Sequence, residues 1–299
     1  MFKNARLLQL TTSLPQEVTA LAEQLATRRF RSCGALETTT LGWAPALGAD
    51  PQLVFAVNDC LLLCARKQER LLPAAALNEA LEERISELES QEARTVGRSE
   101  RRRLREQLLT EMLPHAFTRS RRTRLYLDTA TNWLVIDAAS EKQAEEVVTL
   151  LRETLGTLPV RLPEPQRAPA AVMTEWLLTQ KAPLDFVAGD ACELRDTDAP
   201  DGVVRCRGQD LASAEILNHL RAGKLVTKLA LEWDERFTFV LADDLSFKRI
   251  QLIDAVPDDA NDDANDELEA TAQLQTDFAL FALQMRALIQ RCETVFALQ

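Results

Sequence analysis

Residues 203–253 read VVRCRGQDLASAEILNHLRAGKLVTKLALEWDERFTFVLADDLSFKRIQLI, and this stretch decides the fold class. A β-rich run at 203–207 precedes a helical segment, with Ser213 as candidate N-cap and Gly223 as candidate left-handed residue at its end. After Gly223 the residues alternate between two faces, which is the period of a half-buried strand. The stretch predicts a strand, a helix and three strands, which is typical of an α+β fold with mixed or antiparallel sheets and packed helices.

Basic residues recur along these predicted strands. Lys224 and Lys228 are four residues apart, which in a strand places them about 13 Å apart on the same face. Four further cations can join them on the same sheet, namely Arg205, Arg207, Lys248 and Arg249. One interpretation is a basic face within an acidic protein, and the other is a solvated strand face that carries isolated cations.

The composition limits the class of protein. The chain has 299 residues, which allows one large domain or two to three small ones, and 46% hydrophobic residues, which is enough for a buried core. A formal net charge of -11 argues against a nucleic-acid binder, because such domains are usually basic. That objection fails if the positive charges gather on one surface, since net charge does not determine the local potential.

The sequence also predicts where the protein is found. No run approaches the roughly 18 uncharged apolar residues of a membrane span, and MFKNARLLQLTTSLPQE at the start lacks the apolar core of a signal peptide. We therefore expect a cytoplasmic protein without a membrane partner. Its six cysteines are then expected to be reduced and buried, at Cys33, Cys60, Cys64, Cys192, Cys206 and Cys292.

The predicted elements divide the chain into four segments. Residues 1–72 form an N-terminal α+β segment, 73–117 a projecting helical hairpin, 118–162 a central α+β segment, and 163–299 a C-terminal α+β segment with an acidic loop and a terminal helix. The local signals are capping boxes at Ser13 with Gln16 and Ser140 with Gln143, and a hairpin turn at Asn58-Asp59. The acidic stretch at 258–269 is either a solvated loop and helix start or a DNA-mimicking or protein-docking element.

The two helices of the predicted hairpin carry opposite charges. The first begins at Leu72-Pro73 and has a glutamate-rich outer face, Gly97 breaks it, and Ser99 can cap the second. The second helix carries Arg98, Arg101, Arg102 and Arg103. These arginines either form salt bridges with the first helix or make a basic tip that touches phosphate, and both interpretations can be partly true.

The sequence offers no positive evidence for an enzyme. It has neither a GxxxxGK[ST] phosphate loop nor a GxGxxG turn, and its local sequence suggests no Cys–His or Ser–His pair. Cys60 and Cys64 are four residues apart, but no further ligands are evident, so we predict neither a metal nor a cofactor. Asp243-Asp244 is either a two-metal nuclease site or, in the interpretation we favour, a turn between strands.

Short motifs along nearly the whole chain resemble one known family. They include Phe2-Lys3-Asn4, Gly42-Trp43, Cys64-Ala65-Arg66-Lys67, Thr174-Glu175-Trp176, QDL followed by EI-NH-AGK-VTKLAL-W, and Leu245-Ser246-Phe247-Lys248-Arg249. Their order and spacing are similar to those of the recombination-associated RdgC family of bacterial DNA-binding proteins. No single motif is diagnostic, but the set is specific in combination.

The resemblance implies a function. Proteins of this family form a ring-shaped homodimer whose basic inner surface encircles double-stranded DNA without sequence specificity, and they are associated with the nucleoid. They restrain RecA-promoted recombination, and RecA would be an indirect partner, reached through DNA. The strand cations and the tip arginines are then expected to face DNA. The alternative function is an acidic protein-docking regulator of recombination with weak DNA contact.

Phe117 is the residue that the resemblance assigns to assembly. In the family pattern this phenylalanine lies near the contact between the two subunits. From the residues alone, Pro114 should stop the preceding helix and leave Phe117 on a non-helical turn next to a basic run. Without the resemblance, packing of Phe117 into its own domain is the simpler interpretation.

Overall fold

A computed structural model describes residues 2–12, 17–48, 50–196, 202–253 and 267–298. The predicted capping box at Ser13 and Gln16 and the acidic stretch up to residue 266 lie outside these ranges. The chain divides into two compact units. Unit one comprises Met1–Gln24, Pro45–Cys64 and Thr123–Gln299, and unit two comprises Leu25–Ala44 and Ala65–Arg122.

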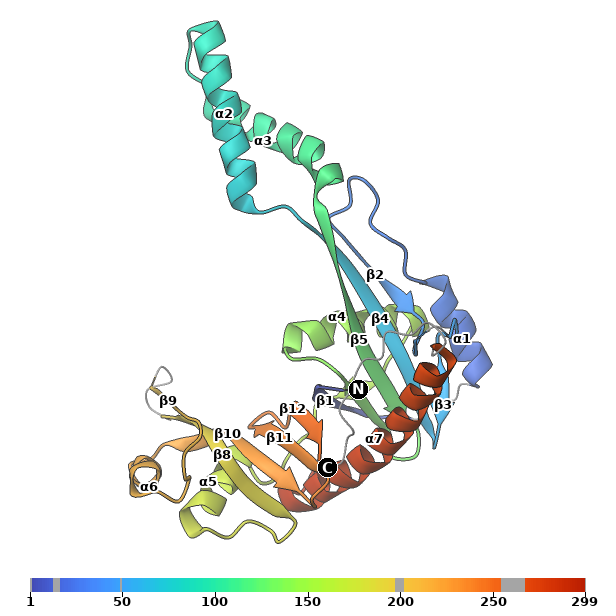
Figure 1. Ribbon diagram of the computed structural model, residues 1–299, viewed down its shortest axis with the longest axis vertical. Coiled ribbons are helices and arrows are strands. Elements are labelled where there is room, and N and C mark those ends of the chain that lie inside the picture. Colours follow the sequence, from blue (N-terminus) through green and yellow to red (C-terminus); the bar gives the residue numbers. More distant parts are fainter. Residues whose placement is uncertain (1, 13–16, 49, 197–201, 254–266, 299) are drawn as a thin grey trace. The chain divides into compact units, whose positions relative to one another are not determined.

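Within the described residues the chain forms twelve strands and seven α-helices (Figure 1). In chain order they are β1 (Asn4–Leu10), α1 (Val18–Thr27), β2 (Thr39–Ala44), β3 (Phe55–Val57), β4 (Cys60–Leu71), α2 (Ala74–Glu92), α3 (Arg98–Met112), the 3-10 helix η1 (Leu113–His115), β5 (Phe117–Asp128), β6 (Trp133–Ile136), α4 (Glu141–Leu155), β7 (Val160–Arg161), α5 (Pro169–Thr179), β8 (Phe186–Arg195), β9 (Val203–Cys206), α6 (Ala214–Arg221), β10 (Leu225–Trp233), β11 (Phe237–Ala242), β12 (Phe247–Leu252) and α7 (Glu267–Phe296).

The strands form one large sheet in the order β2-β4-β5-β6-β1-β12-β11-β10-β8-β9, with β3 on β4 and β7 on β1. From β5 to β9 along this order neighbouring strands run antiparallel, as where Leu7 faces Val135 and Leu231 faces Phe239. The predicted α+β class is therefore confirmed, in its antiparallel form. The strand, helix and three strands predicted for residues 203–253 are confirmed as β9, α6, β10, β11 and β12.

Strand β8 was missing from the sequence prediction. It lies between β10 and β9 and pairs with both. Its first half is exposed from Val187 to Asp190, and Gly189-Asp190 has the composition of a turn, so the sequence shows no alternation there. Its partner strands on either side, rather than its own pattern, hold it in the sheet.

Several local signals act as predicted. Asn58 and Asp59 have φ of +50° and +62°, and Val57 faces Cys60 across this two-residue turn. The hydroxyl of Ser140 accepts a hydrogen bond from the amide of Gln143, which confirms that cap. Ser213 stands at the N-cap of α6 as predicted, but its side chain makes no capping hydrogen bond.

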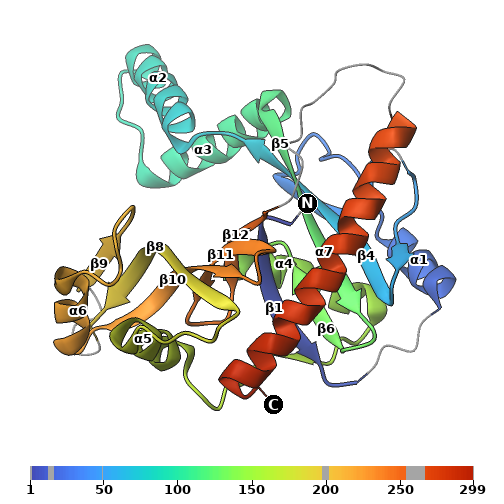
Figure 2. The same cartoon turned by 60° about the horizontal axis from the view of Figure 1, so that its bottom comes forward.

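The long helix α7 forms the centre of the core of unit one, and Figure 2 shows it crossing the strands. The ring of Phe281 stacks on Phe2 of the N-terminal segment and meets Phe237 of β11 edge-on. Farther along the helix, Phe296 contacts Trp176 of α5. One apolar side of a single helix therefore holds together strands from both ends of the chain.

Two ion pairs anchor α7 to the end of β5 and to the connection between α5 and β8. Arg286 donates to both carboxylate oxygens of Asp128 at 2.6 and 2.9 Å, and the Asp128 side chain is only 2% exposed. Arg291 binds both oxygens of Asp185 at 2.7 and 2.9 Å. Because each arginine uses two nitrogens, the pairs define the rotation of the helix as well as its position.

In unit two, α2 and α3 pack against each other through Leu81, Ile85 and Leu104, and lie beyond the adjoining ends of β4 and β5 (Figure 1). The predicted helical hairpin is therefore present. Gly97 is the N-cap of α3, so the prediction that Ser99 caps this helix is wrong. Gly97 already has extended backbone there, and Ser99 falls in the first turn.

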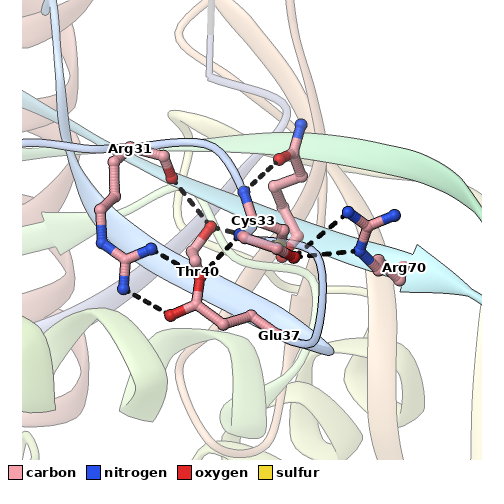
Figure 3. Close-up of polar contacts among 7 residues, drawn as sticks. Arg31, Cys33, Glu37, Thr40 and Arg70 are labelled. Carbon is pink, nitrogen blue, oxygen red and sulfur yellow. Dashed lines mark hydrogen bonds and ion pairs between the residues drawn. The ribbon is translucent and has the colours of Figure 1, made fainter. Parts of the chain in front are cut away.

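The loop at 31–38 of unit two is tied to β4 (Figure 3). Gln68 accepts from the backbone amide of Cys33 at 2.8 Å, and Arg31 forms a two-point ion pair with Glu37 at 2.5 Å. Arg70 donates from Nε and NH2 to the carbonyl of Gly34 at 3.3 and 3.2 Å. Side chains on one strand thus satisfy the backbone of a loop that has little regular structure.

We predict that Arg286→Ala lowers the free energy of unfolding by about 3–5 kcal/mol, because it leaves the buried charge of Asp128 without its partner. Urea unfolding followed by circular dichroism measures the change. The matched control is Arg84→Ala, which removes an exposed ion pair to Glu87 and should cost less than about 0.5 kcal/mol. A loss below about 1 kcal/mol for Arg286→Ala would contradict the anchoring role.

Candidate nucleic-acid interface

Strands β8 to β12 carry a hollow of about 270 Å³ on the sheet face away from the core. We call it the basic hollow, because five cations line it together with Glu193: Arg205, Arg207, Lys228, Lys248 and Arg249. All five were predicted to share one basic face, and the structure brings them together. These five cations are therefore not isolated from one another, and their contact with DNA stays a prediction.

Glu193 organises one side of the basic hollow. Its carboxylate accepts from Lys228 at 2.9 Å and from Arg205 at 3.0 Å, and the side chain is 7% exposed. Arg195, which follows on β8, donates to the same carboxylate at 3.0 Å. In the strand register Glu193 stands directly opposite Arg205 on β9 and Lys228 on β10, so backbone pairing alone aligns these three charges.

These contacts keep Glu193 ionised. Burial acts to raise the pKa of the carboxyl, but hydrogen bonds from Lys228, Arg205 and Arg195 outweigh burial and lower the pKa to about 2. The hydrogen bonds also restrict the side chains of the cations, which in free solution would sample many rotamers. Glu193 thus holds part of the positive charge at fixed positions in the basic hollow.

A bulge in β10 decides which lysines reach this surface. The pairing with β8 shifts between Val226 and Lys228, so Val226 is buried in the core while Lys228, two residues on, faces the other side. The amide of Val226 donates at 2.9 Å to the hydroxyl of Thr174 on α5. The prediction that Lys224 and Lys228 share one strand face is wrong, because the bulge reverses the alternation between them. Lys224 instead binds Asp196 at 3.0 Å and does not line the basic hollow.

A second bulge acts on β12. Its register against β11 shifts between Thr238 and Val240, and both Phe247 and Ile250 are buried. The two cations between them, Lys248 and Arg249, therefore both lie on the face away from the core. Neither these two residues nor Arg207 forms an ion pair within the described ranges, although the charge of Lys248 helps to lower the pKa of Asp244. The positive charge of Arg207 and Arg249 is available to a ligand, and Lys248 adds to it.

The arginines of α3 divide between the two predicted roles. Arg101 forms an ion pair with Glu82 of α2, as the salt-bridge interpretation requires. Arg102 and Arg103 contact only Glu106 and Glu100 on their own helix, at 4.0 and 3.9 Å, and Arg98 has no partner in the described part of the chain. Such exposed contacts contribute little free energy, so these arginines stay accessible. The salt-bridge interpretation is confirmed for Arg101, and contact of the other three arginines with phosphate stays a prediction.

Phe117 is the most exposed aromatic side chain of unit two in the described ranges. It begins β5 rather than standing in a turn, and it is 85% exposed. The interpretation that Phe117 packs into its own domain is therefore wrong. The segment before it is held firmly, because Arg70 donates from one nitrogen to the carbonyls of Leu113 and Ala116.

The proposed nuclease carboxylates belong to a turn. Asp243 and Asp244 connect β11 to β12, and Asp244 accepts from the amide and hydroxyl of Ser246 and pairs with Arg6 at 3.2 Å. The described residues contain no group of three His, Cys, Asp or Glu side chains that could hold a metal ion.

No helix in the same ranges is long and apolar enough to cross a bilayer. The six cysteines are free thiols, and the expectation that all are buried is wrong for Cys33 and Cys206, which are half-buried.

Sequence reasoning missed two residues of the site, Glu193 and Arg195, because it missed β8. A weak signal was present. Glu193 is a lone acid within the run Ala191-Cys192-Glu193-Leu194, whose neighbours are small or apolar. A charged residue in such a run requires a partner when it is buried.

Comparison with known proteins supports one family over the whole chain. The family model described as "Putative exonuclease, RdgC" matches residues 1–299. The chain belongs to the RdgC family. One relative is named "Recombination-associated protein RdgC" and comes from Pseudomonas fluorescens (strain Pf0-1). It is 41% identical to this chain over 284 residues, which cover 94% of this chain and 92% of the relative. The relative of the same name from Tolumonas auensis is 41% identical over 280 residues, covering 93% and 92%. The predicted RdgC resemblance is thus confirmed.

We predict a pH signature for Glu193. The pKa of Glu193 is lowered in the folded protein. Its carboxylate therefore stabilises the fold fully when the pH is above the ordinary glutamate pKa of 4.5, and this stabilisation is lost as the pH falls towards the folded pKa of about 2. The stability difference between the parent and Glu193→Gln should be constant from neutral pH to about pH 5 and shrink by about 2 kcal/mol by about pH 3.

Urea unfolding at a series of pH values measures this difference. Glu232→Gln is the control, since Glu232 also lies on β10 but forms no ion pair with any described residue. Its difference from the parent should stay small throughout. A Glu193→Gln difference that does not change with pH would show that the cations do not hold this carboxylate ionised.

Proposed function

We propose that this protein is a non-enzymatic binder of double-stranded DNA that recognises the backbone rather than the base sequence. The observation that carries the proposal is the basic hollow, where five cations face one carboxylate in a chain of net charge -11. The net charge of the chain argued against nucleic-acid binding. Because a ligand responds to the local potential, the gathering of positive charge on one face removes that objection.

The chemistry of the basic hollow suits phosphate. Guanidinium groups present a planar fork of donors that matches phosphate oxygens, and lysine adds point charges. Arg249 on β12 and Arg207, directly after β9, are exposed side chains at a sheet surface, a geometry that follows a backbone more readily than it reads bases in a groove. Binding would then depend on counterion release and vary little with sequence.

We further propose that two copies form a ring around the duplex. An exposed Phe117 supports this, because a large aromatic side chain at the centre of a symmetric contact is a frequent anchor. Relatives named for recombination support a role in that process. A ring on duplex DNA, associated with the nucleoid, would limit the access of RecA without touching it.

Arg207→Ala combined with Lys248→Ala should weaken binding to random-sequence and defined duplexes alike. The slope of log affinity against log salt should decrease in magnitude by about 0.9 for each lost contact, about 1.8 in total. Fluorescence anisotropy from low to high salt measures both quantities. Lys224→Ala, outside the basic hollow, is the matched control and should leave the slope unchanged. The proposal fails if the folded double variant keeps the parental slope.

Phe117→Ala should shift the protein from dimer to monomer in sedimentation velocity and weaken DNA binding in parallel. Truncation of a central interface aromatic costs about 2 kcal/mol or more, so the dimer dissociation constant should rise about 30-fold. The unfolding midpoint should hardly change, since the side chain is exposed. Leu162→Ala, at a 63% exposed leucine of unit one, serves as control. An unaltered dimer would remove Phe117 from the contact.

A further inference from the structure

The backbone at Arg249 is strained. Its φ of +54° lies in the left-handed region, which a residue with a Cβ atom adopts at a cost and which glycine adopts freely. The residue lies inside β12, at the bulge that leaves Lys248 and Arg249 together on the outer face. In a regular strand one of two consecutive residues would point into the core. The strain therefore accompanies a specific result, the placement of two adjacent cations in one hollow.

The positive charge in this place exceeds what the protein itself neutralises. Glu193 is already occupied by Lys228, Arg205 and Arg195. Lys248, Arg249 and Arg207 line the same hollow without an ion pair in the described residues, and of the three only Lys248 acts on a nearby carboxylate, that of Asp244. Cations without ion pairs in a concave surface concentrate anions there. A solvated flat face would need neither the concavity nor the strained residue.

We propose that the basic hollow is a binding site for a terminal phosphate group, the phosphomonoester at the end of a DNA strand or on a free nucleotide. Its volume of about 270 Å³ is below the roughly 300–1,000 Å³ of pockets for drug-sized ligands, so it admits a small group. The assignment of this phosphate to the end of a DNA strand rests on the proposed function. The binding of a phosphate group in the hollow does not depend on it.

A terminal phosphate fits this arrangement better than a phosphate within the backbone. A monoester carries a charge of about -1.5 to -2 and three free oxygens, whereas an internal diester carries one charge and two free oxygens. Three unpaired cations can each meet one of the three oxygens. The end of a strand can also enter a hollow that the continuous backbone of a duplex can only pass over.

The test compares two short blunt duplexes of identical sequence, one with 5′-phosphate ends and one with 5′-hydroxyl ends. Anisotropy competition should show binding about tenfold tighter for the phosphorylated duplex, the value expected of one added charge-assisted contact. Arg249→Gly should abolish this preference and, because it relieves the left-handed strain, unfold at a urea concentration equal to or above that of the parent. Lys224→Ala should keep the preference.

A second measurement separates the two sources of phosphate. Deoxyadenosine 5′-monophosphate and deoxyadenosine are titrated into the parent and into Arg249→Gly. Tighter binding of the monophosphate by the parent alone, without a preference between duplex ends, supports the site and assigns it to free nucleotides. Absence of both preferences overturns the inference, and so does a preference that survives in Arg249→Gly. If the inference is overturned in this way, normal affinity of the parent protein for closed circular duplex leaves the proposed function standing. Failure of the parent protein to bind any duplex would refute the proposed function instead.

Discussion

The burial of one side of α7 against the sheet is the constraint on which unit one depends. A sheet this large must cover an apolar face, and α7 covers it by contact with aromatic residues from the segment before β1 and from β5, β11 and α5. The bidentate pairs to Asp128 and Asp185 then set how the helix lies. Hydrophobic burial supplies most of the free energy, and the two buried or half-buried ion pairs define the geometry.

Once one face of β8 to β12 is committed to the core, the other is free to carry charge. Two bulges use this freedom. The bulge in β10 buries Val226 and turns Lys228 outward, and the bulge in β12 turns Lys248 and Arg249 outward together. Glu193 then fixes Lys228 and Arg205 through backbone register. The basic hollow is thus a consequence of irregular pairing between strands, stabilised by one carboxylate whose pKa its neighbours lower.

This arrangement reconciles an acidic chain with the proposed affinity for a polyanion. Repulsion acts over about a Debye length in physiological salt, so glutamates on distant surfaces are largely screened at the hollow, while the local cations are not. Relatives in the same family are named for recombination, and in the proposed dimer the exposed Phe117 would contact the second copy. The proposed assembly and the observed charge pattern would then both serve to present a positive surface on an acidic protein.

The sequence by itself determined the features that depend on neighbours along the chain. The alternation after Gly223 identified β10 to β12, and the signals at Asn58-Asp59 and Ser140 located a turn and a helix start, because these are satisfied by local backbone geometry. Only the tertiary structure decided the features that depend on partner strands. Alternation counts residues and cannot register a bulge, so Lys224 and Lys228 were assigned to one face although the shift at Val226 separates them. The same limit hid β8, and with it Glu193, since pairing with β10 and β9 gives that strand its place.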